Sequence, residues 1–118
     1  MKSYKELSVW QRSIELVICI YKISAKFPAD ERYCLTNQIH RSAISIPANI
    51  AEGWGRNSRK EYVQFLIVSR GSAFELQTHT EIAHRLGFLS TEKYVMLNNE
   101  IDEITKMLNG LIRSIRNK

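Results

Sequence analysis

The sequence predicts an all-α protein in which residues 1–118 form a single antiparallel four-helix bundle. Apolar residues recur at three- and four-residue spacing through four long segments, and this spacing is the period of an amphipathic helix. The segments are separated by short stretches that contain Pro or Gly, and none shows the polar–apolar alternation that is typical of a strand. Because the connections are short, consecutive helices are expected to run in opposite directions, up-down-up-down.

The first helix is predicted over residues 8–26. Its apolar stripe is expected to face the core and consists of Leu7, Trp10, Ile14, Val17 and Tyr21. Phe27-Pro28 ends this helix, because a residue that precedes proline is displaced from the helical region of backbone conformation.

The second helix is predicted over residues 31–53, with a core-facing stripe formed by Leu35, Ile39, Ser42, Ile46 and Ile50. Pro47 lies inside this helix and lacks the N–H group that would bond to the carbonyl of Ala43, so we expect a kink there. Gly53-Trp54-Gly55 ends the helix.

The third helix is predicted over residues 58–86 and begins with a capping box, in which Ser58 and Glu61 bond to each other's amides. Its stripe comprises Tyr62, Phe65, Leu66, Ser69, Ala73, Leu76, Ala83 and Leu86. Gly87 ends this helix. The fourth helix is predicted over residues 90–117, with Ser90 as its N-cap. It carries an unbroken heptad seam made of Leu97, Ile101, Ile104, Leu108, Leu111 and Ile115.

The chain is basic, with 17 Lys and Arg against 12 Asp and Glu and a formal net charge of +5. Such an excess favours anionic partners such as RNA or DNA. The cations concentrate in two basic segments, residues 56–70 and residues 106–118. An up-down-up-down bundle places these two segments at the same end. The residues that we predict to bind nucleic acid are Arg56, Arg59, Lys60, Arg113, Arg116 and Lys118. The alternative is that these residues are only solvent-exposed charges on the surface and at the helix ends.

Two further residues lie in or beside the first basic segment. Arg70 belongs to the same run of cations, in which Glu61 is the only acid. Trp54 lies beside Arg56, and its ring either stacks on a nucleic-acid base or packs against the end of the core or a subunit interface.

A line of polar residues borders the apolar stripe of the second helix and is formed by Arg41, Ser45, Asn49, Glu52 and Arg56. We interpret Arg41, Asn49 and Glu52 as structural. Asn49 is expected to bond to backbone groups that the proline leaves open, and Glu52 to pair with Arg56 or Arg41. The alternative interpretation is a polar binding surface.

No pattern typical of catalysis or metal binding is found, so we expect no metal, no cofactor and no enzymatic activity. His79 and His84 are five residues apart and do not share a helical face, as i, i+4 metal ligands would. Cys19 and Cys34 form no Cys-x-x-Cys pair. Neither a secretory signal nor a membrane-spanning apolar run is present, so we expect a cytoplasmic location and no membrane partner.

A long part of the chain resembles a known protein family. The residues that carry the resemblance are Phe27-Pro28, Glu31-Arg32-Tyr33, Leu35-Thr36, Gln38-Ile39, Arg41-Ser42-Ala43, Ser45 through Gly53, Gly55-Arg56, Ser58, Glu61-Tyr62, Phe65-Leu66, Gly71-Ser72, Glu75-Leu76 and Leu86-Gly87. This pattern is similar to that of the four-helix bundle proteins encoded in intervening sequences of bacterial large-subunit (23S) ribosomal RNA genes. The related accessory protein of diversity-generating retroelements is similar too. Cys34 departs from the pattern, since glycine is common at that position.

The resemblance implies a four-helix bundle that assembles as a ring-like homopentamer, and in the retroelement relatives a basic ring that contacts a reverse transcriptase and nucleic acid. We therefore predict a non-enzymatic homopentameric scaffold that binds RNA or DNA, with a protein partner as a further expectation. Assembly is also favoured by aromatic residues beyond the needs of one small core, namely Trp10, Tyr33, Trp54, Phe65, Phe74 and Phe88. The alternative is a purely structural ring that contacts only protein.

Overall fold

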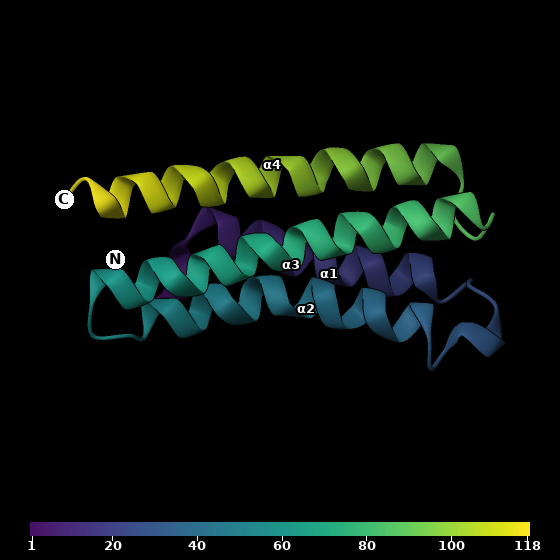
Figure 1. Ribbon diagram of the computed structural model, residues 1–118, viewed down its shortest axis with the longest axis horizontal. Coiled ribbons are helices and arrows are strands. Elements are labelled where there is room, and N and C mark those ends of the chain that lie inside the picture. Colours follow the sequence, from purple (N-terminus) through teal and green to yellow (C-terminus); the bar gives the residue numbers. More distant parts are fainter.

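The computed structural model describes all 118 residues and contains four long α-helices and no strand, which confirms the predicted all-α class. The helices are α1 (Ser8–Ser24), α2 (Leu35–Trp54), α3 (Arg59–Arg85) and α4 (Thr91–Arg116). Two short 3-10 helices, η1 (Tyr4–Glu6) and η2 (Ala29–Glu31), precede α1 and α2. The molecule is elongated, with principal extents of 46 by 24 by 20 Å (Figure 1).

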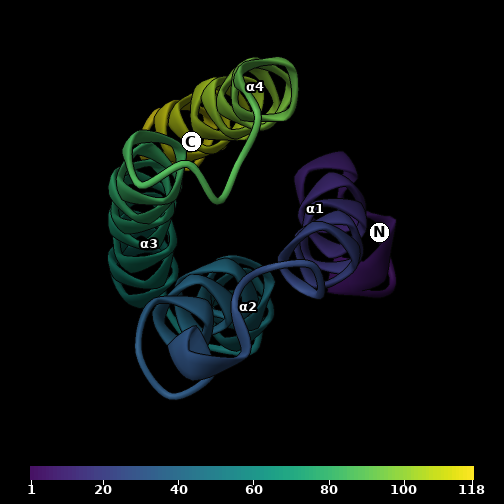
Figure 2. The same ribbon diagram turned by 90° about the vertical axis from the view of Figure 1, so that its right-hand side faces the viewer.

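The helices surround one core in chain order. Each long helix packs against the next, and α1 also contacts α4, less extensively than any other neighbouring pair (Figure 2). The α2–α3 connection and the C-terminus lie at one end of the molecule, whereas the α1–α2 and α3–α4 connections lie at the other end (Figure 1). This arrangement is compatible with the up-down-up-down order.

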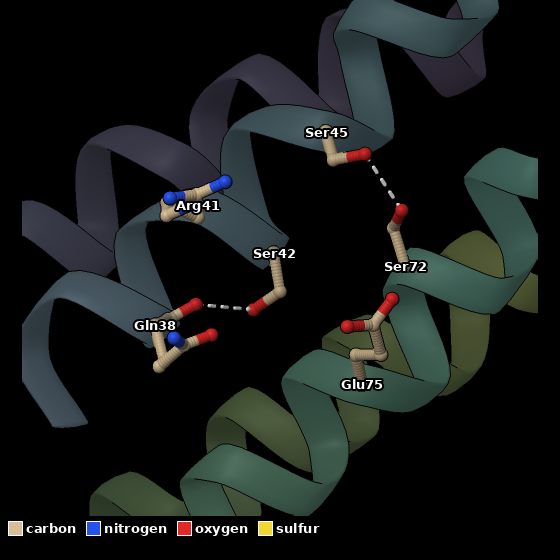
Figure 3. Close-up of a pocket in the computed structure, with 6 residues that line it drawn as sticks. All are labelled: Gln38, Arg41, Ser42, Ser45, Ser72 and Glu75. Carbon is tan, nitrogen blue, oxygen red and sulfur yellow. Dashed lines mark hydrogen bonds between the residues drawn. The ribbon is translucent and has the colours of Figure 1, made fainter. Parts of the chain in front are cut away.

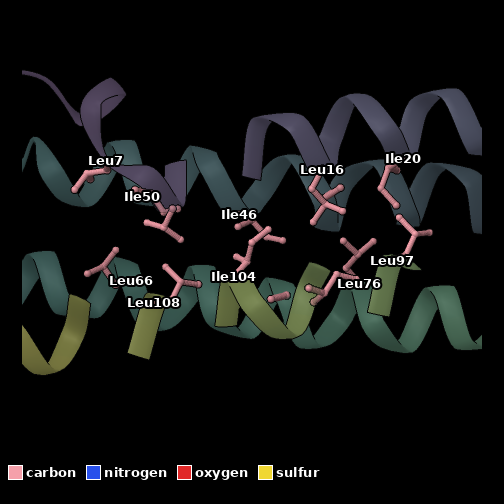
Figure 4. Packing of buried hydrophobic residues seen from close by; sticks show 14 of the residues in the cluster. Leu7, Leu16, Ile20, Ile46, Ile50, Leu66, Leu76, Leu97, Ile104 and Leu108 are labelled. Carbon is pink, nitrogen blue, oxygen red and sulfur yellow. The ribbon is translucent and has the colours of Figure 1, made fainter. Parts of the chain in front are cut away.

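The core consists of branched aliphatic side chains from all four helices (Figure 4). On α2 and α4 the buried residues follow the predicted stripes closely. Two predicted members, Leu35 and Leu111, are only half-buried, and Ile112 is buried beside Leu111. On α3 the predicted Leu86 is 57% exposed, while Thr80, which fills the gap between Leu76 and Ala83, is buried. The predicted stripes therefore find the core face and its serines Ser42 and Ser69, but miss the buried Ser72 and Thr80.

The stripe predicted for the first helix is only partly correct: Leu7, just before α1, is buried, but Trp10, Ile14 and Val17 are half-buried and Tyr21 is exposed. The buried residues of α1 are Val9, Ser13, Leu16, Ile20 and Ser24. The hydroxyls of Ser13 and Ser24 donate to carbonyl oxygens of the same helix, those of Trp10 and Tyr21, so each is buried with a partner. Because α1 is apolar on most of its circumference, apolar spacing alone does not identify its core face. The core face is the one that carries the two buried serines, and Tyr21 lies outside it and is exposed.

The predicted range 31–53 begins four residues too early, because α2 starts at Leu35. Residues 29–31 form η2, and Cys34 has the non-helical dihedral angles φ −120° and ψ −105°. Glu31 lies outside the helix, and its carboxylate accepts a hydrogen bond from the Leu35 amide at 3.4 Å. At its other end α2 continues through Pro47 without a break as far as Trp54.

The caps of α3 and α4 follow the sequence. Ser58 Oγ accepts a hydrogen bond from the Glu61 amide at 3.1 Å, and Ser90 Oγ accepts one from the Lys93 amide at 3.2 Å. The reciprocal bond of the capping box, from the Ser58 amide to Glu61, is not formed. Gly87 has φ +81°, a conformation that glycine adopts without strain, and it ends α3. None of the four helices is long and apolar enough to span a membrane.

Candidate nucleic-acid interface

The basic residues predicted to bind nucleic acid lie at the end of the molecule where α2 passes into α3 and α4 ends (Figure 1). Arg59 and Lys60 open α3, while Arg113 and Arg116 lie in the last turn of α4. The Arg59 guanidinium donates a hydrogen bond to the main-chain carbonyl oxygen of Lys118. The start of α3 and the end of α4 are therefore in direct contact.

A shallow depression lies between these two helix ends, with a volume of about 370 Å³. Three of its lining residues are the exposed cations Arg59, Lys60 and Arg116, and no carboxylate lines it. The remaining lining residues are Val63, Gln64 and Ile115. Guanidinium and ammonium groups that surround an acid-free depression suit an anionic group such as phosphate.

A second depression of about 310 Å³ lies farther along the same two helices. It is lined by Arg70, Arg113 and Arg116, together with Asn109, Ile112 and Asn117. Arg70 Nη1 donates to Asn109 Oδ1 at 2.9 Å, which ties this guanidinium to α4. Arg116 lines both depressions, so the two adjoin.

Arg70 is a candidate residue that the sequence prediction did not include. It follows Arg59 by 11 residues, which is about three helical turns, so both side chains project from the same side of α3. This spacing could have identified it. Its partner Asn109 could not be identified in this way, because the pairing depends on how α3 packs against α4.

Arg56 belongs to a different part of the surface from the other predicted residues. Its guanidinium carbon lies 4.6 Å from the centre of the Phe65 ring, and its Nη2 lies 3.8 Å from a carboxylate oxygen of Glu52. The ring of Trp54 is half-buried and packs edge-on against Tyr62, with ring centres 6.3 Å apart. These contacts support the packing interpretation of Trp54.

The polar line of α2 borders a groove of about 360 Å³ between α2 and α3 (Figure 3). Only polar side chains line this groove, namely those of Gln38, Arg41, Ser42, Ser45, Ser72 and Glu75. Ser45 Oγ and Ser72 Oγ are 2.7 Å apart and join the two helices. Asn49 Nδ2 donates to the carbonyl oxygen of Ser45 at 2.8 Å and to its hydroxyl at 2.9 Å. Asn49 thus bonds within its own helix, but to the carbonyl of Ser45 and not to that of Ala43, which Pro47 leaves open.

A histidine of α3 contacts one of the serines that line the groove. His79 Nδ1 lies 3.1 Å from Ser42 Oγ, and burial lowers the pKa of His79, although the nearby Glu75 acts in the opposite direction. The nearly buried Ser42 hydroxyl also lies within bonding distance of the Gln38 and Ile39 carbonyl oxygens. Of these contacts, the one between Ser42 and His79 joins α2 to α3. No group of three or more His, Cys, Asp or Glu side chains is placed to hold a metal ion.

Substitution of Glu52 by alanine is expected to lower the free energy of unfolding by less than about 1 kcal/mol, because the Glu52–Arg56 pair is a surface ion pair. Its two side chains are 57% and 43% exposed, and the closest N–O distance is 3.8 Å. Thermal unfolding at matched protein concentration tests this expectation. A large loss of stability would show that Glu52 has a buried partner in an assembly, and a loss of partner binding without loss of stability would favour the binding interpretation.

Comparison with known proteins gives a consistent family assignment. The family described as 23S rRNA-intervening sequence protein matches residues 5–110. One similar solved structure is that of a protein with unknown function from the S23 ribosomal protein family of Bacteroides thetaiotaomicron VPI-5482. The two chains are 30% identical, with a TM-score of 0.79, and the match covers 88% of this chain and 97% of the other. No curated protein matches the chain.

Proposed function

The chain belongs to the 23S rRNA-intervening sequence protein family, and from this premise we propose that it is a non-enzymatic, homo-oligomeric scaffold that binds nucleic acid through its basic end. The basic end is the end of the bundle that carries Arg56, Arg59, Lys60, Arg113, Arg116 and Lys118. We take the four helices to alternate in direction, up-down-up-down, so that the α2–α3 turn and the end of α4 stay together in every copy. A protein partner, which the resemblance to the accessory protein of diversity-generating retroelements suggests, is an additional part of the proposal.

The observation that carries this proposal is the contact between the two basic segments. Arg59 bonds to the backbone of Lys118, and Arg59, Lys60 and Arg116 surround one acid-free depression. Clustered cations bind a polyanion by neutralising several phosphates at once and releasing their counterions. The energy of such binding does not depend on base sequence. The geometry therefore supports binding of RNA or DNA with little sequence preference.

RNA binding by the wild-type protein is expected to depend steeply on salt. A protein that contacts several phosphates loses roughly 10³-fold or more in affinity between about 50 and 200 mM salt. The measurement is a filter-binding titration of a structured RNA and a duplex DNA across that range. If neither binds at the low-salt end, the nucleic-acid part of the proposal is wrong and the protein-only ring becomes the better account.

Self-association is supported by apolar side chains that the single chain leaves exposed. The large ones that are at least 43% exposed include Tyr33, Ile44, Val68, Phe74, Ile82 and Leu86. Four of the six aromatic residues that suggested assembly in the sequence are instead half-buried, because Trp10, Trp54, Phe65 and Phe88 contact their own chain. Tyr33 and Phe74 are the two that remain exposed. Exposed apolar patches on a small protein commonly mark contacts with other subunits.

The assembly is expected to contain five copies, as the family resemblance implies. Five copies that each carry +5 would bring a formal charge of +25 to one ring and strengthen its attraction for polyanions. Light scattering coupled to size exclusion should give about five times the 13.7 kDa mass of the chain. A 13.7 kDa species at micromolar concentration would contradict the oligomeric part of the proposal while leaving nucleic-acid binding to be judged by its own titration.

A further inference from the structure

The two acid-free depressions between α3 and α4 form one continuous cationic surface, which we call the α3/α4 face. It consists of Arg59, Lys60, Arg70, Arg113 and Arg116. The helix segments that carry most of it, residues 62–74 and 106–118, contain no Asp or Glu. Glu61 lies about half a turn away from Val63 around α3 and is not among the lining residues.

The cations of the α3/α4 face are not paired with acidic side chains. Two arginines elsewhere in the chain are paired in this way: Arg12 with Glu100 at 2.8 Å and Arg85 with Glu81 at 2.9 Å. None of the four ion pairs in the chain involves a residue of the α3/α4 face. Two cations of the face are held in place: Arg59 by the main-chain oxygen of Lys118, and Arg70 by the neutral amide of Asn109. Asn109 thus restricts the guanidinium without neutralising it.

We propose that the α3/α4 face binds two phosphate groups of a linear phosphate chain, one in each depression, with Arg116 between them. This inference rests on the proposed function and narrows it, since it assigns Arg70 to the site and leaves Arg56 outside. Guanidinium groups match phosphate oxygens in two-pronged geometry, so arginine is well suited to this task. No aromatic side chain lines either depression, so neither offers a ring on which a base could stack.

Two sources share this chemistry, the backbone of a single-stranded nucleic acid and inorganic polyphosphate. A backbone ligand also meets the cations around the face, whereas a short polyphosphate reaches only the two depressions. The two probes are therefore a fluorescently labelled oligouridine RNA and sodium tripolyphosphate.

The test compares Arg70→Gln and Arg116→Gln with Arg32→Gln, which removes the same charge at the other end of the molecule. Each lost phosphate contact should reduce the slope of log affinity against log salt by about 0.7 for a single strand. We expect this reduction for Arg70→Gln and for Arg116→Gln, and no reduction for Arg32→Gln. A change in slope separates a phosphate contact from a structural role, and circular dichroism melting verifies that each variant folds.

The outcomes separate the failure of this inference from that of the proposed function. If RNA binds and Arg70→Gln behaves like Arg32→Gln, the phosphate site on the α3/α4 face is wrong and the proposed function stands. If RNA does not bind but calorimetry shows tripolyphosphate binding that Arg70→Gln weakens, the site stands with polyphosphate as its ligand and the proposed function is wrong. If neither probe binds at about 50 mM salt, both are overturned.

Discussion

Replacing all six predicted nucleic-acid-binding residues with glutamine is expected to reduce the affinity for RNA at about 50 mM salt by at least about 100-fold. The replaced residues are Arg56, Arg59, Lys60, Arg113, Arg116 and Lys118. Non-specific binding is almost entirely electrostatic, so the variant should also lose most of the dependence of affinity on salt. Because these side chains are exposed, the substitutions should change the free energy of unfolding little.

A charge-matched variant controls for the loss of net charge. It also removes six cations away from the basic end, from the four helices and the α1–α2 connection, namely Lys22, Lys26, Arg32, Arg41, Arg85 and Lys93. If binding depends on the basic end, this control should retain most of the salt dependence. Equal losses in both variants would show that only the overall charge matters, and that the end of the bundle is not a site.

Replacing Gly53 with alanine is expected to destabilise the protein by about 2 kcal/mol, because a methyl group at this position overpacks the α2–α3 contact. The added Cβ would lie 2.9 Å from the Phe65 Cβ and 3.1 Å from the Tyr62 carbonyl oxygen. Both are rigid parts of α3, so the helices would have to separate. Thermal unfolding at matched protein concentration should show a melting temperature lower by roughly 5–10 °C.

Gly110→Ala provides the matched control for this substitution. Gly110 lies inside α4, and nothing lies within 4 Å of the position where a Cβ would be added. Here alanine only improves helix propensity, so we expect a stabilisation of up to about 1 kcal/mol. Opposite signs for the two variants would locate the effect in the close approach of α2 and α3. A stabilised Gly53→Ala variant would contradict that contact.

The helices themselves could largely be predicted from sequence, because apolar period, caps and breakers act locally. Ser58 and Ser90 accept a hydrogen bond from a backbone amide in the first turn of a helix, and Gly87 adopts a positive φ after a helix ends. Few residue types meet these requirements, so each of the three marks a helix boundary. The orientation of α1 could not be predicted in this way. Its apolar residues cover most of its circumference, and the buried Ser13 and Ser24 are selected by packing and by bonds to their own helix.

The basic end was predicted in part, because topology alone places the α2–α3 turn beside the end of α4 in an up-down-up-down bundle. What sequence could not supply is which cations share a surface. Arg56 contacts the Phe65 ring and pairs with Glu52, whereas Arg70 donates a hydrogen bond to Asn109, 39 residues away along the chain. Both choices depend on side-chain packing between helices, for which a single sequence contains no local signal.

Ultraviolet cross-linking of the wild-type protein to an oligouridine RNA, followed by mass spectrometry of the cross-linked peptides, tests the central claim most directly. If the basic end and the α3/α4 face form the interface, cross-links should fall within residues 56–70 and 106–118, and should disappear at about 200 mM salt. Cross-links confined to the α2–α3 groove around residues 38–49, or spread evenly over the chain, would contradict the account.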